Sequence, residues 1–205
     1  CNNREKKSHF LILGGLMEFD YVVVGAGSAG CAVANRLSQS GNYRVALIEA
    51  GPSDNSPWIH VPVGYYRTMG NPKSDWCYET QSDKGIADRS IPWPRGRVMG
   101  GSSSINGLLY VRGQPQDFDI WSQLGCAGWS WDEVLPYFKR SENWDGIDET
   151  GLRGEDGPLS VQSARLKRDI VDHWVDAAVS AGYQRNYDYN GSTQEGVGHF
   201  QLTMK

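Results

Sequence analysis

The chain has 205 residues, of which 39% are hydrophobic and 21% are charged, and its formal net charge is −4. This length is enough for one globular domain or slightly more, and an acidic balance without a basic stripe argues against a nucleic-acid partner. The 4 cysteines form no CxxC pair, which suits a reducing cytoplasm and predicts no metal site. No stretch reaches the roughly 18 apolar residues that a membrane-spanning helix needs.

Residues 1–16 are expected to precede the folded part of the protein. Met17 stands just before the first predicted strand, so we expect it to be the true start and the preceding residues to be a leader or read-through. A signal peptide is the alternative, because basic residues precede the apolar run 10–13. That run is short, two glycines end it, and no small-residue cleavage site follows. We therefore expect a cytoplasmic protein, with peripheral membrane association left open.

The first predicted unit is a strand, a glycine turn, a helix and a second strand. Residues 19–24 are rich in β-branched side chains, as a buried parallel strand requires. The helix that follows carries a small apolar face and ends near 40–42, and residues 44–48 form the second strand. This α/β arrangement is the one that binds the ADP half of a dinucleotide at the start of a helix.

The glycine turn supplies the expected phosphate contacts. Gly25 permits the tight turn out of the strand, and Gly27 lets the backbone approach a pyrophosphate. Gly30 lets the helix pack closely on the strand. The first helical turn, which includes Ser28 and Ala29, leaves N–H groups unpaired, and their partial positive charge favours phosphate.

An acid follows the second strand at the distance that a dinucleotide site requires. Glu49 lies about 20 residues after Gly30, where its carboxylate accepts hydrogen bonds from the adenosine ribose hydroxyls. The same charge repels a 2′-phosphate and so disfavours NADP. A glycine-rich turn without a ligand is the alternative. In that case the strand, the helix and the acid would match the dinucleotide-binding pattern only by coincidence.

The segment 52–94 is rich in proline, which favours extended loops, and all 8 tryptophans lie from Trp58 onward. We expect these aromatic side chains to pack beneath long loops. A second glycine cluster follows at Gly100 and Gly101, with three serines after it at 102–104. Their N–H and hydroxyl groups form a candidate anion-binding nest, and the serines are good helix N-caps. A capped helix beside a flexible loop is the alternative.

Later segments carry ordinary helix and strand signals. Ser130 and Glu133 have the spacing of a capping box, so a helix is predicted from Trp131, with Pro136 as a potential kink. A linker rich in glycine and acids is expected at 145–157. A short strand then follows at 158–161, and a helix at 166–181 ends at a glycine cap. The buried face of that helix is predicted to hold Ile170, Val171, Trp174, Ala177, Ala178 and Ala181.

Together the two glycine clusters resemble the glucose–methanol–choline (GMC) family of FAD-dependent alcohol oxidoreductases. The stretches that carry the resemblance are 20–30, 76–80, 96–107, Arg112-Gly113 and 128–138. A nicotinamide enzyme needs one such cluster, whereas a flavin dinucleotide needs a second contact region. The resemblance implies an α/β fold: an incomplete FAD-binding, Rossmann-like domain over 17–157 that includes a lid loop, and the start of a substrate-side region over 158–205.

The resemblance also implies roles for the matching positions. The residues implied to hold the diphosphate and the ribose are Gly25, Gly27, Ser28, Ala29, Gly30 and Glu49. The residues implied to lie along the flavin are Gly101, Ser102, Asn106, Gly107 and Leu109. Some members bind FAD covalently through a histidine just before the Asn106 position. Ile105 stands there, and isoleucine cannot form that bond, so we expect non-covalent FAD.

The implied activity is hydride transfer from the CH–OH group of a small alcohol to the flavin, with oxygen or a carrier as the final acceptor. The chain looks closest to bacterial choline- and alcohol-dehydrogenase-like members. The family's catalytic base is a histidine near the carboxyl terminus, and none of the histidines here matches it: His9, His60, His173 and His199. We therefore assign no catalytic residue and expect an amino-terminal fragment that is inactive alone. An NAD-dependent dehydrogenase and a non-catalytic flavin-binding module are the alternatives.

Overall fold

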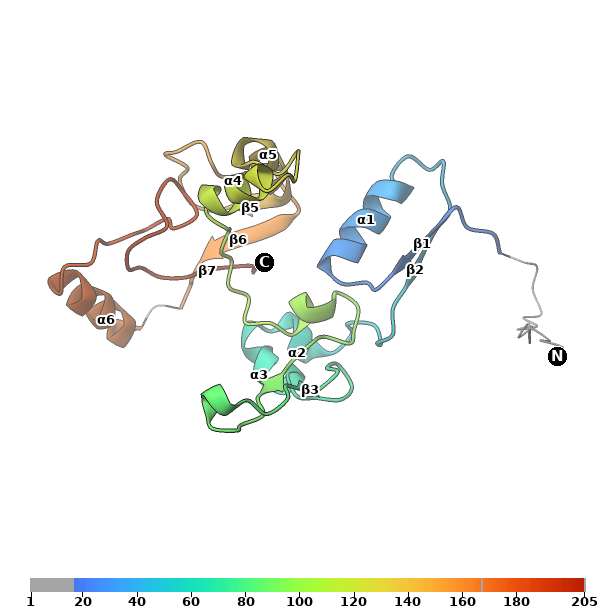
Figure 1. Ribbon diagram of the computed structural model, residues 1–205, viewed down its shortest axis with the longest axis horizontal. Helices are drawn as coiled ribbons and strands as arrows, with labels where there is room; N and C mark the ends of the chain where they lie inside the picture. Colours follow the sequence, from blue (N-terminus) through green and yellow to red (C-terminus); the bar gives the residue numbers. More distant parts are fainter. Residues whose placement is uncertain (1–16, 167, 205) are drawn as a thin grey trace. The chain divides into compact units, whose positions relative to one another are not determined.

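The computed structural model describes residues 17–166 and 168–204 (Figure 1). The predictions of a leader or a signal peptide fall on residues outside this range. The chain forms two compact units, of which the first ends at Ile105 and the second begins at Asn106. Each unit mixes helices and short strands, in agreement with the predicted α/β class.

The first unit begins with the predicted strand, helix and strand. Its elements, with η denoting a 3-10 helix, are β1 (Tyr21–Val24), α1 (Ser28–Ser38), β2 (Val45–Ile48), α2 (Pro57–His60), η1 (Pro62–Gly64), α3 (Tyr65–Thr68), β3 (Tyr78–Glu79), η2 (Lys84–Ile86), β4 (Pro92–Trp93) and η3 (Gly101–Ser104). β1 and β2 pair in parallel, with Tyr21 opposite Val45, and α1 packs against both strands (Figure 1). A Cβ on Gly30 would stand 1.9 Å from the Gly25 carbonyl oxygen, so the expected close helix packing is confirmed.

The faces of β1 and β2 are more exposed than the sequence predicts. Val24 is 81% exposed, and Val22 and Ile48 also lie largely in solvent. The expectation of a buried strand is therefore wrong for the part of the chain that the structure describes. Parallel strands are normally covered on both faces. Here the two paired strands are covered chiefly by α1.

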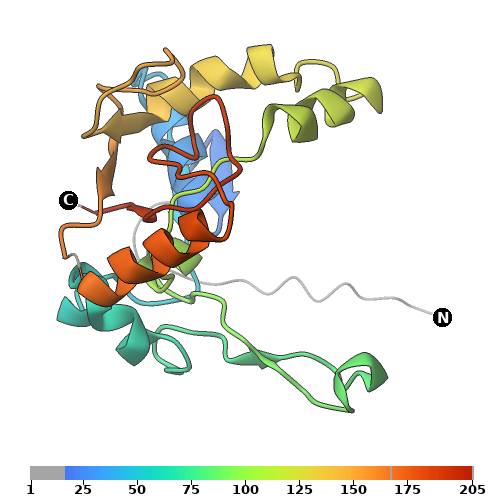
Figure 2. The ribbon, with the colours of Figure 1, turned by 90° about the vertical axis from the view of Figure 1, so that its left-hand side faces the viewer.

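The segment 52–94 contains short helices and a hairpin in place of the predicted extended loops. Pro57 and Pro62 lie in the first turns of α2 and η1, positions where the missing N–H costs nothing. β3 and β4 then pair antiparallel, and Figure 2 shows this hairpin (green) as a long arm with η2 at its tip. At these two positions proline begins a helical turn, because its fixed φ is close to the φ of a helix.

A buried carboxylate fastens the base of this arm. Asp75 is 2% exposed, and its oxygens accept hydrogen bonds from the backbone N–H groups of Gly70 (2.7 Å), Cys77 (3.0 Å) and Arg95 (2.9 Å). Burial acts to raise the pKa of Asp75, but these N–H donors outweigh it, and the pKa lies below its ordinary value of 3.8. The ionised form therefore joins three segments of the first unit.

The second unit consists of helices beside a small sheet. Its elements are α4 (Pro115–Gln123), α5 (Trp131–Ser141), β5 (Glu142–Trp144), β6 (Leu159–Ser163), α6 (Asp169–Ser180) and β7 (Gln201–Leu202). The predicted capping box at the start of α5 is confirmed, because the Ser130 N–H donates to Glu133 at 3.1 Å. Helix α4, which was not predicted, begins with its own capping box between Gln114 and Asp117.

The core of the second unit is a buried ion network. The fully buried Glu142, at the start of β5, accepts hydrogen bonds from Arg112 (2.5 Å), from Arg153 (2.5 Å) and from the Gly154 N–H (2.9 Å). Arg153 also pairs with Asp188 at 2.5 Å. The expected linker at 145–157 is therefore wrong. Arg153 and Gly154 in this loop are buried, because both donate hydrogen bonds to the Glu142 carboxylate.

Helix α6 has the predicted place in the chain but not the predicted buried face. Trp174 is 64% exposed, and Ile170 also faces solvent. The inner side of the helix follows Asp172, Val175 and Ala178, so it includes the predicted Ala178, but of these three only Val175 is buried. On this inner side the Asp172 carboxylate lies 2.8 Å from Nε2 of His199, within hydrogen-bond distance.

We expect Glu142→Gln to lower the free energy of unfolding by about 3–5 kcal/mol, because the buried Arg112 and Arg153 would lose their shared counter-charge. Chemical denaturation of the complete gene product measures this loss. Glu133→Gln is the matched control, since it makes the same chemical change in an exposed capping box. Equal losses for the two variants would contradict the assigned role of Glu142.

We also expect acid to remove the stability that Asp75 provides. Its pKa is lowered by folding, so this stability is fully present above pH 3.8 and is lost as the pH falls through the lower folded-state value. The free-energy difference between the native protein and Asp75→Asn should therefore shrink below pH 3.8. Denaturation curves from pH 2 to pH 7 test this, and a constant difference would refute it.

Candidate functional site

The two glycine clusters touch each other in the first unit. The Gly100 N–H donates to the Ala26 carbonyl at 2.7 Å, and Gly27 and Gly100 form a parallel bridge. Gly101 has a φ of +60°, and a Cβ placed on it would lie 2.9 Å from the Gly27 Cα. The backbones can approach this closely because Gly101 carries no side chain. We refer to this contact as the glycine crossing.

The start of helix α1 lies at the glycine crossing. Gly27 is its N-cap and makes no side-chain cap hydrogen bond, so the first-turn N–H groups near Ser28 and Ala29 keep their free donor capacity. Gly25 turns the chain with a φ of +94°. A Cβ at Gly25 or at Gly27 would meet no atom within 4 Å. The open space and the uncapped donors fit an anionic group such as a diphosphate.

Glu49 lies beside the same turn. Its Oε2 accepts from the Ala26 N–H at 2.8 Å, and its Oε1 accepts from the Gly51 N–H at 2.9 Å. These bonds were not predicted from the sequence, and they fix the carboxylate after β2. Each carboxylate oxygen can accept a second hydrogen bond, so Glu49 keeps acceptor capacity for ribose hydroxyls.

The serines of the second cluster were expected to suit a helix N-cap, but none of them caps a helix. Ser102 accepts from the Gly96 N–H at 3.0 Å, whereas Ser103 donates to the Gly100 carbonyl at 2.6 Å and Ser104 to the Met99 carbonyl at 2.7 Å. Only one turn, η3, forms here, and its N-cap Gly100 has no side chain. The left-handed glycines bring backbone carbonyls within reach of the hydroxyls, which therefore stabilise the turn itself.

Three predicted flavin-side residues lie at the start of the second unit. Asn106 accepts from the Leu108 N–H at 2.9 Å through its Oδ1, so its side chain shapes the local turn. A Cβ at Gly107 would meet nothing within 4 Å. Leu109 is 53% exposed and pairs with Leu202 of β7. Leu108 and Thr203, which the sequence analysis did not single out, make the remaining backbone contacts of this segment.

The predicted site residues thus divide between the two units. Those of the first unit are Gly25, Gly27, Ser28, Ala29, Gly30, Glu49, Gly101 and Ser102, and those of the second are Asn106, Gly107 and Leu109. The residues of the first unit fit the phosphate-and-ribose portion of a dinucleotide, because open space, helix N–H groups and one carboxylate meet there.

The described histidines make local contacts. His60 lies 2.7 Å from the Asp54 carbonyl oxygen, His199 pairs with Asp172, and His173 is exposed on α6. His9 lies outside the described residues. Across residues 17–166 and 168–204, no group of three or more His, Cys, Asp or Glu side chains could hold a metal ion.

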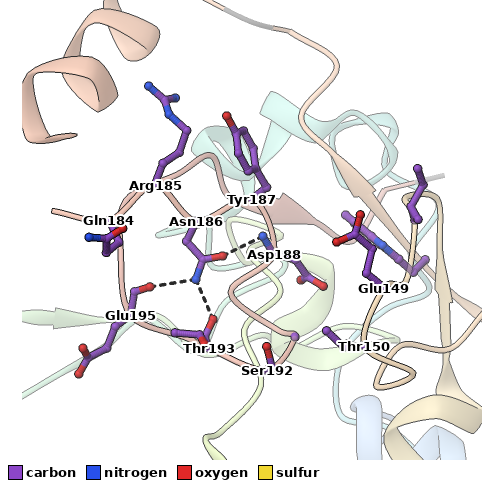
Figure 3. A pocket seen from close by; sticks show the side chains of 13 residues that line it. Glu149, Thr150, Gln184, Arg185, Asn186, Tyr187, Asp188, Ser192, Thr193 and Glu195 are labelled. Carbon is purple, nitrogen blue, oxygen red and sulfur yellow. Dashed lines mark hydrogen bonds between the residues drawn. The ribbon is translucent and has the colours of Figure 1, made fainter.

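A polar cavity of about 650 Å³ lies within the second unit (Figure 3). Asn186 fixes its wall, because its amide donates to the carbonyls of Thr193 (2.7 Å) and Glu195 (3.0 Å), while its Oδ1 accepts from the Asp188 N–H (2.9 Å). None of the predicted site residues lines this cavity. Its rim is built from the loops at 144–150 and 184–195.

In the part of the chain covered by the structure, each helix is too short or too polar to cross a bilayer. The aromatic side chains gather most densely in the second unit. There the ring of Phe118 contacts those of Trp121, Trp131 and Phe138 with centroids 5.4–5.7 Å apart. Outside this cluster the expectation that the aromatic side chains pack beneath loops is wrong, because Trp58, Trp76 and Trp93 are 42–49% exposed.

Comparisons with known proteins agree with the geometry. The chain is 47% identical over 190 residues to an oxygen-dependent choline dehydrogenase of Vibrio vulnificus (strain YJ016), covering 91% of this chain and 34% of that protein. It is 41% identical to an alcohol dehydrogenase [acceptor] of Pseudomonas putida, again covering 91% and 34%. The crystal structure of pyridoxine 4-oxidase from Mesorbium loti superposes with a TM-score of 0.86 at 36% identity, covering 92% of this chain and 37% of that one.

The chain therefore spans about a third of the length of the relatives that it matches. The GMC oxidoreductase family, whose N-terminal domain binds FAD, matches residues 19–205. Because this match covers nearly the whole sequence, the chain belongs to the GMC oxidoreductase family.

Proposed function

We propose that this chain forms the FAD-binding part of an oxidoreductase that acts on the CH–OH group of small alcohols. The supporting observation is the glycine crossing, where Gly27 and Gly101 meet at the uncapped start of α1. Two glycine segments in contact offer more phosphate and ring contacts than the single glycine turn of a nicotinamide enzyme. The crossing therefore favours a flavin dinucleotide over NAD.

Each predicted residue has a binding or orienting role in this proposal. The N–H groups around Ser28 and Ala29 hold the diphosphate at the start of α1, and Glu49 accepts hydrogen bonds from the ribose. Gly101, Ser102 and the segment 106–109 bind and orient the flavin. When bound, FAD supplies the acceptor for the hydride of the alcohol carbon. We place no catalytic base among the described histidines.

The substrate class rests on the named relatives, which are choline and alcohol dehydrogenases. We propose a small alcohol, and oxygen or a separate carrier as the electron acceptor. The division into an FAD-binding part over 17–157 and a substrate-side part from 158 belongs to the same proposal. It differs from the structural division, in which the first compact unit ends at Ile105.

The complete gene product should purify with bound FAD or bind added FAD and turn yellow. Because Ile105 has no nucleophilic side chain, acid precipitation should release the flavin into the supernatant. Absorption spectra of the supernatant and of the redissolved pellet measure this. A colourless protein that does not take up FAD would overturn the proposed function, and flavin retained in the pellet would overturn non-covalent binding.

Gly101→Ala should weaken FAD binding at least about tenfold, because the new methyl group would force the glycine crossing apart. Gly41→Ala is the matched control. Gly41 has a similar φ of +71°, but a Cβ there would meet nothing within 4 Å. Both variants lose some stability through the left-handed φ. Titration with FAD separates them, and equal FAD affinities would contradict the role of the crossing.

A further inference from the structure

We propose that Thr203 is a positioning residue for the flavin. It holds Leu108 in a left-handed conformation and so fixes the segment 106–109 in the shape that the flavin contacts. This inference rests on the proposed FAD binding, and it adds a residue that lies far from both glycine clusters in the sequence.

Leu108 has an unusual backbone conformation. Its φ is +65°, a region that residues other than glycine seldom occupy because the Cβ crowds the following carbonyl. Such conformations persist only where surrounding contacts hold them, and they gather at ligand-binding sites. Leu108 lies between Gly107 and Leu109, both predicted flavin contacts, so the unusual residue occupies the centre of the segment.

Three hydrogen bonds hold this conformation. The Leu108 N–H donates to Asn106 Oδ1 at 2.9 Å. The Leu108 carbonyl accepts from the Thr203 N–H at 2.8 Å and from the Thr203 hydroxyl at 3.2 Å. Thr203 therefore holds the carbonyl twice, once through its backbone and once through its side chain. Of these bonds, the hydroxyl bond is the one that a conservative substitution can remove.

The pairing with β7 determines which backbone groups remain free. Residue 109 lies opposite Leu202, between the bond from Thr203 to Leu108 and the bond from Tyr110 to Gln201 (2.9 Å). In an antiparallel pair, a residue at such a position directs its own N–H and carbonyl away from the partner strand. The backbone of Leu109 is therefore free to meet a ligand on the side away from β7.

Thr203 directly follows β7, which is anchored by buried polar side chains of the second unit. Gln201 is buried, and its Oε1 accepts from Asn190 at 2.8 Å. The Oδ1 of Asn190 in turn accepts from the Arg112 N–H at 2.7 Å. Because these anchoring side chains are buried and hydrogen-bonded, they hold β7 in place, and with it the Thr203 hydroxyl that bonds to Leu108.

The test compares Thr203→Val with Thr203→Ser in the complete gene product loaded with FAD. Valine keeps the shape and the backbone bond but lacks the hydroxyl, so the Kd for FAD should rise about threefold to tenfold. The ratio of affinities for reduced and oxidised FAD should change about threefold, which is about 14 mV in the two-electron midpoint potential. Serine should restore both values. Ser180→Ala, which removes an exposed hydroxyl-to-carbonyl bond on α6, should leave both unchanged.

Leu108→Gly is the second variant, for the case in which valine at 203 prevents folding. Glycine adopts a φ of +65° without strain but also reaches other conformations, so bound FAD would have to order the segment and the Kd should rise about threefold. If the native protein binds no FAD, the proposed function fails. If it binds FAD and both variants match it in Kd and in potential, the positioning role of Thr203 fails alone.

Discussion

The approach of Gly101 to Gly27 is the contact on which the candidate site depends. A Cβ on Gly101 would lie 2.9 Å from the Gly27 Cα, so a side chain there would push the two backbones apart. The crossing joins the second glycine cluster to the start of α1, and the Ala26 N–H beside it holds Glu49. The turn, the helix start and the acid are therefore fixed by one set of close backbone contacts.

The core of the second unit contains a buried polar network beside its apolar side chains. Glu142 is 0% exposed and contacts two arginines, so this part of the core depends on complete hydrogen bonding. The same network includes Arg112, which lies three residues after the segment 106–109 and whose backbone N–H donates to Asn190. A buried network of this kind holds its members in one arrangement, which suits a segment whose own conformation at Leu108 is unfavourable.

Two of the wrong predictions share one cause. The loop 145–157 reads as a linker, yet Arg153 is buried because Glu142, eleven residues earlier, needs a counter-charge. The inner face of α6 follows Val175, and Asp172 on the same face contacts His199, a partner that lies far along the chain. In both cases a distant partner decides burial, and local periodicity carries no information about it.

Local chemistry alone determined the strand, glycine turn and helix at 21–38, the capping box at Ser130 and the family to which the chain belongs. These follow from the sequence because a glycine or a cap acts on its immediate neighbours. Only the tertiary structure revealed the contact between Gly27 and Gly101, the ion network of Glu142 and the hold of Thr203 on Leu108. Each of these joins residues that are distant in sequence, and their approach depends on how the whole unit packs.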